Sequence, residues 1–267
     1  MPQQRTPRTL RDVSHLFLSG GESARARVPR RSEAVIWIAA VGSSVNRAYL
    51  AAGAAAACAK LGMQVSLAEV SRNLPNIGYY FGLEPADYLG PAVDRATLGS
   101  GAWGESVRFC FSTIPSSLGR CAVDAAQQDA PHAIIVAFSC PAGRARSPFF
   151  AGLGVAAAAL SDQGEGAARH PDCVIVAADG PHMVQARGLS SDVRARFPGA
   201  VVFSIAHASE RGLAIDADES LVLPRELGAS VARRMPPTDG SFDELVASVF
   251  QILSLRRRKA VVHAASG

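Results

Sequence analysis

Residues 34–68, AVIWIAAVGSSVNRAYLAAGAAAACAKLGMQVSLA, decide the fold. An apolar run at 34–40 is followed by a short Gly/Ser loop at 41–46, an alanine-rich segment that ends at Leu61, and a second apolar run at 64–68. Apolar β-branched runs indicate buried strands, and the alanine-rich segment between them indicates a helix. The pattern predicts a βαβ unit whose first loop leads into a helix N-terminus, where backbone N–H groups and the helix dipole favour a phosphate.

The rest of the chain repeats these strand and helix signals. Further strands are expected at 107–111, 133–138, 173–177, 200–205 and 221–223, and helices at 47–61, 75–81, 148–161, 181–197 and 241–256, with one more ending near residue 128. Near-continuous Val/Ile/Ala runs are typical of strands that are covered on both faces. The alternation therefore predicts an α/β fold, with a doubly wound, mostly parallel sheet and helices on both faces.

The basic residues divide the chain into three parts. The net charge of +4 is concentrated at the two ends, so we expect an arm at 1–33, the α/β domain at 34–256 and a basic tail at 257–267. Within the arm, apolar side chains recur at helical spacing, and the predicted partner-binding residues are Leu10, Val13, Leu16, Phe17 and Leu18. A short amphipathic helix on a Gly/Ser/Arg/Pro tether is typical of a docking peptide. Packing of this helix against its own domain is an equal alternative.

Cysteine and histidine usage predicts no metal site. The five cysteines form no C-x-x-C pair and no zinc spacing, and the six histidines show no ligand spacing. Free buried thiols, the lack of a visible signal peptide and the lack of a run of about 20 apolar residues together predict a cytoplasmic protein.

Two segments resemble the MinD/ParA family of deviant Walker A ATPases, in particular its MinD and FlhG branch. They are AAGAAAACAKLG at 51–62 and QVSLAEVSRNLPNIGYYFGLEP at 64–85. They align without gaps with the family text N-L-A-x-x-L-A-x-x-G and V-L-L-I-D-A-D-x-x-L-P-N-x-x-x-x-L-G, which follows the family's K-G-G-x-G-K-T-T loop. A later segment at 171–193 is similar to the family's A-D-x-V-I-V-V-T-x-P-E region. The resemblance implies a P-loop NTPase-like fold.

The phosphate loop departs from the family pattern. The resemblance places a vestigial cofactor-binding loop on Gly42, Ser43, Ser44, Asn46 and Arg47. Gly42 stands at the signature lysine, Arg47 at the Walker lysine, and Ala48 at the Mg²⁺-binding Thr or Ser. A P-loop needs a lysine that bridges phosphate oxygens and a hydroxyl on the metal. Ala48 cannot ligate Mg²⁺, whereas Arg47 keeps a positive charge on a bulky planar head.

The carboxylates of the family are missing as well. Its D-A-D motif becomes Glu69-Val70-Ser71, so only Glu69 could substitute, and the Asp of its D-T-P-A-G motif falls near Ala137. The adenine-reading Asn falls near Ala206. Phosphoryl transfer depends on positioning by lysine, Mg²⁺ and carboxylates, so no catalytic residue and no efficient ATP hydrolysis are expected.

These departures imply a pseudo-ATPase, not an enzyme, that regulates or scaffolds a larger assembly. The alternative is a slow nucleotide-dependent ATPase switch that uses Arg47 and Glu69, so weak ATP or ADP binding stays open. The expected partners are a protein bound through the arm, and a second copy or an active paralogue in a dimer. Peripheral contact with the inner face of a membrane stays open. Nucleic acid is disfavoured, because the arginines are not interleaved with stacking aromatic residues.

Overall fold

A computed structural model gives the structure of the domain. It describes residues 33–41, 44–71, 77–82, 95–96, 106–112, 132–139, 146–159, 168–178, 180–207, 217–223, 234–237 and 240–265. The chain divides into two units, Met1–Ser32 and Glu33–Gly267, and every described residue belongs to the second. The predicted partner-binding residues of the arm therefore lie outside the described part of the chain.

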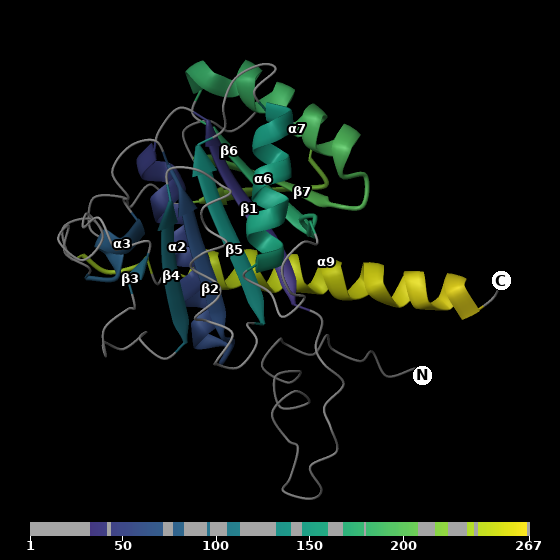
Figure 1. Cartoon of the computed structure of the whole chain (residues 1–267), viewed down its shortest axis with the longest axis horizontal. Coiled ribbons are helices and arrows are strands. Elements are labelled where there is room, and N and C mark those ends of the chain that lie inside the picture. Colours follow the sequence, from purple (N-terminus) through teal and green to yellow (C-terminus); the bar gives the residue numbers. More distant parts are fainter. Residues whose placement is uncertain are drawn as a thin grey trace, which may run out of the picture. The chain divides into compact units, whose positions relative to one another are not determined.

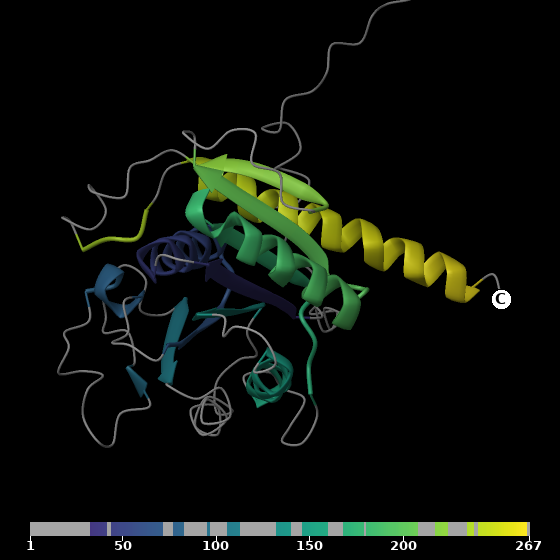
Figure 2. The ribbon, with the colours of Figure 1, turned by 90° about the horizontal axis from the view of Figure 1, so that it is seen from above.

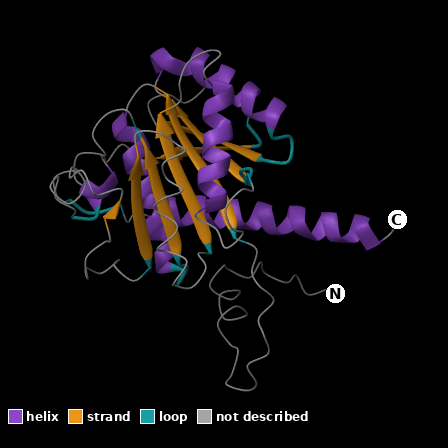
Figure 3. Cartoon of the chain, viewed as in Figure 1, coloured by secondary structure: helices purple, strands orange, loops and turns teal. Residues whose placement is uncertain are grey.

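An eight-stranded sheet forms the centre of the domain (Figures 1 and 3). The strands are β1 (Ala34–Val41), β2 (Val65–Val70), β3 (Arg95–Ala96), β4 (Val107–Ser112), β5 (Ala133–Ser139), β6 (Cys173–Ala178), β7 (Val201–His207) and β8 (Glu219–Leu223). Their order is β3-β4-β2-β5-β1-β6-β7-β8, and every pairing is parallel except that of β3 with β4. This order confirms the predicted α/β fold with a mostly parallel sheet.

Helices cover both faces of the sheet. They are α2 (Ser44–Lys60), α3 (Ile77–Tyr80), α6 (Arg146–Ala159), α7 (Met183–Arg196), which follows a short 3₁₀ helix (Gly180–His182), and α9 (Gly240–Ala265). Ile36 and Ile38 belong to a buried cluster with α2 and α9, while Val35 and Trp37 belong to a second cluster with α6 and α7. Figure 2 shows α9 and α6 on opposite sides of the sheet. Burial on both faces explains why alternate residues of the strands are equally apolar.

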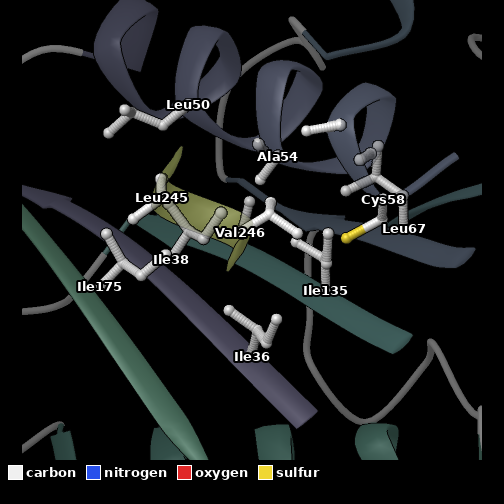
Figure 4. Packing of buried hydrophobic residues seen from close by; sticks show 14 of the residues in the cluster. Ile36, Ile38, Leu50, Ala54, Cys58, Leu67, Ile135, Ile175, Leu245 and Val246 are labelled. Atoms are coloured by element: carbon white, nitrogen blue, oxygen red, sulfur yellow. The ribbon is translucent and has the colours of Figure 1, made fainter. Parts of the chain in front are cut away.

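Helix α2 is buried almost all round. Its side chains from Arg47 to Cys58 are buried, because the helix packs against the sheet on one side and against α9 on another. Figure 4 shows Leu50, Ala54 and Cys58 of α2 above the strands, next to residues of α9. A helix that is apolar all round needs such complete cover. Gly53 lets α2 and α9 approach each other closely, because a Cβ atom at this position would lie 2.4 Å from Cε1 of Phe242 in α9.

Side-chain carboxylates secure the amino ends of several strands. The backbone N–H of Val35 donates to Oδ2 of Asp172 over 2.8 Å, and that of Val202 donates to Oδ2 of Asp218 over 2.8 Å. Arg169 forms an ion pair with Glu33, immediately before β1. Glu33 is buried and belongs to the domain, so the arm ends one residue earlier than the predicted boundary at residue 33.

The C-terminal end of the domain differs more from the prediction. Helix α9 continues to Ala265, whereas the sequence predicted a helix ending at residue 256 and a separate basic tail at 257–267. No Gly or Pro interrupts residues 241–266, and Arg, Lys and Ala have high helix propensity.

The two-residue strand β3 was not predicted, and the helix expected to end near residue 128 lies outside the described residues. Among the helices described, none has the length and apolar character needed to cross a membrane.

Candidate functional site

The candidate site lies at the carboxyl ends of the central strands. Strand β1 ends at Val41, and α2 begins at Ser44, so the predicted phosphate loop connects them. Gly42 and Ser43 lie outside the described residues, and the side chains of Ser44 and Asn46 are likewise not described. Of the five residues assigned to the vestigial loop, Arg47 is the one whose side chain can be placed.

Arg47 is buried and forms an ion pair. Its side chain starts from the first turn of α2, and Nη2 donates to Oε1 of Glu69 over 2.7 Å. The two side chains are 1% and 0% exposed, so both charges are removed from water. Nη1 of Arg47 donates to the hydroxyl of Ser139, the last residue of β5. Both terminal nitrogens of the guanidinium are therefore engaged within the domain.

Glu69 uses its second oxygen to hold α3. The backbone N–H of Ile77, the first residue of α3, donates to Oε2 of Glu69 over 3.0 Å. Glu69 sits near the end of β2, in which all six residues are buried. A buried carboxylate is tolerated only when it is paired and hydrogen-bonded, and here a guanidinium and a backbone N–H provide both.

Small neighbours accompany this buried pair. Glu69 lies in register with Ala137 on the adjacent strand β5, and Ser139 lies in register with Ala40 on β1. Ala48, which follows Arg47, is also fully buried. Alanine at positions 48 and 137 provides neither a hydroxyl nor a carboxylate for a metal ion. Among the described residues, no three His, Cys, Asp or Glu side chains gather as metal ligands would.

One polar atom of the site lacks a partner. Nε of Arg47 is buried, and it makes no hydrogen bond to any described atom. A buried N–H without a partner costs free energy, so the remaining contacts of the guanidinium must outweigh that cost. The short, charge-assisted bond to Glu69 is the strongest candidate for this role.

The described cysteines are not placed for chemistry at this edge. Cys58, Cys110 and Cys173 are buried. Burial raises the pKa of the Cys58 thiol to about 12 and also raises the pKa of the Cys173 thiol, so both stay neutral at physiological pH. Cys140, which the sequence places just after β5, lies outside the described residues.

Sequence reasoning identified Arg47 and Glu69 but missed Ser139 and the N–H of Ile77 as parts of the site. The positions of both residues relative to the strands could have indicated that they belong to the site. Ser139 ends a strand that neighbours both β1 and β2, and Ile77 follows β2 after a short connection. The carboxyl ends of parallel strands in a doubly wound sheet share one functional edge.

The structural comparisons agree with this architecture. No protein-family model matches the sequence, and no curated protein matches it at the sequence level. The fold is similar to that of the septum site-determining protein MinD from Pyrococcus horikoshii, solved with Mg-ADP, at 13% identity and a TM-score of 0.53. That match covers 84% of this chain and 98% of the MinD chain.

Two further MinD structures give the same result. The MinC:MinD cell division complex of Aquifex aeolicus matches at 15% identity and a TM-score of 0.53, over 82% of this chain and 96% of that chain. The cell division ATPase MinD of Pyrococcus furiosus matches at 13% identity and a TM-score of 0.51, over 82% and 99%. At such identities the likeness shows the fold alone, namely the mostly parallel α/β fold of these MinD structures.

Proposed function

We propose that the protein is a catalytically degenerate MinD/ParA-like pseudo-ATPase, of the FlhG-like kind, that regulates or scaffolds a larger assembly. One observation carries this proposal. Arg47, which stands where the family has its Walker lysine, has both terminal nitrogens engaged by Glu69 and Ser139. A phosphate-binding cation must present its N–H donors to the ligand, whereas Nη1 and Nη2 of Arg47 both donate to protein acceptors.

The neighbouring residues support the same proposal. Mg-nucleotide chemistry needs a hydroxyl on the metal and carboxylates that place the metal and the water, whereas positions 48 and 137 are alanine. Glu69 is the one carboxylate left in the aligned motifs, and its two oxygens bind Arg47 and the Ile77 N–H. These side chains do not suit Mg-ATP, so no catalytic step is assigned to them.

The proposed scaffolding role rests on the surfaces that such a fold presents to protein partners. One structural neighbour was solved as a MinC:MinD complex, so a domain of this shape can present surfaces to a protein partner. We infer that this chain binds a protein through Leu10, Val13, Leu16, Phe17 and Leu18 of its arm, and that it pairs with a second copy or an active paralogue. Recruitment by that partner to the inner face of a membrane is part of the same proposal.

The first test measures nucleotide binding by isothermal titration. The purified full chain is titrated with ATP and with ADP, each with and without Mg²⁺, after denatured protein has been checked for co-purified nucleotide. No heat and no bound nucleotide are the expected results. Mg²⁺-dependent binding in the micromolar range that is lost in a folded Arg47→Ala variant would overturn the proposal and establish the slow switch that uses Arg47.

A second test addresses the arm. The full chain, a deletion of residues 1–32 and the variant Val13→Asp/Phe17→Asp serve as baits, with circular dichroism as the check that each domain folds. We expect a partner that the full chain retains and that both altered baits lose. Equal recovery by all three baits would show that the arm does not recruit the partner.

A further inference from the structure

We propose that Arg47 and Glu69 form an internal latch that holds the carboxyl edge of the sheet in one conformation without any ligand. The latch consists of the side chains of Arg47, Glu69 and Ser139 together with the backbone N–H of Ile77. This inference rests on the proposed function, because it assigns to the chain's own side chains the ordering role that a ligand would otherwise fill.

The latch joins four separate segments of the chain. Arg47 belongs to α2, Glu69 to β2, Ser139 to β5 and Ile77 to α3. Three hydrogen bonds connect them: Arg47 to Glu69, Arg47 to Ser139, and Ile77 to Glu69. Ser139 is thus joined to Arg47 and Ile77 to Glu69, on either side of the central ion pair.

The strand order explains why an arginine occupies the centre. Strand β5 lies between β1 and β2, so a side chain from the helix that follows β1 must reach across β5 to meet Glu69. The two terminal nitrogens of a guanidinium diverge in a rigid plane and can serve two acceptors at once. In Arg47 one nitrogen binds Ser139 on β5 while the other binds Glu69 on β2. The single ammonium of a lysine lacks this fork.

Glu69 extends the latch to α3. Its Oε2 accepts the N–H of Ile77, which is itself fully buried. Tyr80, at the other end of α3, packs edge-on against Tyr49 of α2 with ring centroids 6.4 Å apart. The short helix is thus fixed to the domain at its first residue by the carboxylate and at its last by an aromatic contact.

Burial keeps the latch closed. The side chains of Arg47 and Glu69 are 1% and 0% exposed, so salt and water screen their attraction little. Separating them would break a buried ion pair, which makes an open arrangement strongly unfavourable. The latch therefore holds α2, β2, β5 and α3 together without a ligand, in contrast to an arrangement that a ligand orders and releases.

Hydrogen exchange followed by mass spectrometry tests the latch in the full chain, with no nucleotide present. The decisive variant is Arg47→Met, because the described hydrogen bonds connect Arg47 to α3 through Glu69. We expect amides in the peptide covering 77–82 to exchange about tenfold faster than in the wild type. Amides of β7, at 201–207, serve as the internal reference for global unfolding. Because Arg47→Met also lowers global stability, the comparison uses labelling times of seconds to minutes, at which β7 should stay protected in a folded domain.

Two further variants complete the design. Lys60→Met removes an exposed ion pair with Asp243 at the far end of the same helix, and it should leave the exchange of 77–82 unchanged. Arg47→Lys retains the charge opposite Glu69 but replaces the two terminal nitrogens with one, so it should produce a smaller increase even if Arg47→Met does not fold.

Unchanged exchange at 77–82 in Arg47→Lys and in a folded Arg47→Met, or equal increases at 77–82 and 201–207, would overturn the latch. Because no nucleotide is added, this failure is separate from failure of the proposed function, which would appear as nucleotide binding in the titration.

Discussion

Removing one member of the Arg47–Glu69 pair should destabilise the domain far more than removing both. The informative changes are Arg47→Met and Glu69→Gln, made singly and together. Arg47→Met leaves a buried carboxylate opposite an apolar group, and Glu69→Gln leaves a buried guanidinium without a counter-charge. The double variant leaves neither charge, and the glutamine oxygen can still accept the N–H of Ile77.

The expected magnitudes follow from the burial of both groups. Removing one partner of a buried ion pair costs about 3–5 kcal/mol, because the other charge stays desolvated. Folded domains have free energies of unfolding of about 5–15 kcal/mol, so each single variant should lose a large share of its stability. The double variant should lose roughly 2 kcal/mol or less, which gives a coupling energy of at least about 4 kcal/mol between positions 47 and 69.

Urea unfolding, followed by circular dichroism and by tryptophan fluorescence, measures these losses. With an m-value of about 2–3 kcal/mol/M, the midpoint of each single variant should fall by roughly 1–2 M. The matched control is the cycle Lys60→Met and Asp243→Asn, whose ion pair spans 3.3 Å between side chains that are 34% and 49% exposed. Exposed pairs contribute about 0–1 kcal/mol, so this control should show little coupling.

A different outcome would refute the reasoning. If Arg47→Met changes the free energy of unfolding by less than about 1 kcal/mol, with the same m-value as the wild type, then the charge of Glu69 is not paired inside the domain. Coupling no larger than that of the control cycle would lead to the same conclusion. Arg47 would then be free to bind a ligand, and the slow nucleotide switch would become the better proposal.

Packing and burial elsewhere lead to three further expectations. Gly53→Ala should lower the free energy of unfolding by roughly 1–2 kcal/mol in thermal melts, since the new Cβ would lie 2.4 Å from the Phe242 ring and helix propensity offsets only part of the overlap; Phe242→Leu should restore part of the loss. Burial raises the pKa of Cys58 and of Tyr80 to about 12 each, so the unfolded chain loses these protons at lower pH than the folded chain. These groups should therefore leave stability unaffected below about pH 9. Above that, stability should fall by about 1.4 kcal/mol per pH unit for Cys58 from about pH 9, and for Tyr80 from about pH 10, up to about pH 12; flat stability from pH 9 to 11 would contradict this. Iodoacetamide at neutral pH should leave Cys58 and Cys173 unmodified in the native protein and modify both in urea, as mapped by mass spectrometry.

The fold could be predicted from the sequence because its strands are covered on both sides. Strand β1 reads as an unbroken apolar run, and the alanine-rich α2 follows it directly, so both elements were located within a few residues. Elements whose stability depends on tertiary contact were not found. The strand β3 has two residues and exists through its antiparallel pairing with β4, which local composition does not reveal.

The site was only half predictable, for a similar reason. The positions of Arg47 and Glu69 could be aligned, but their pairing could not be inferred. They are separated by 22 residues along the chain. How Arg47 reaches Glu69 depends on strand β5, which comes much later in the sequence and lies between β1 and β2. An isolated arginine near a helix start usually reads as an exposed cation that is ready for an anion. In this fold Arg47 is instead buried and paired with Glu69.

The buried pair also restricts how the sequence can evolve. A substitution at position 47 or 69 alone passes through a protein that holds an unpaired buried charge, and selection against unfolded chains removes such intermediates. The two positions are therefore expected to change together among descendants of this chain, although 22 residues separate them.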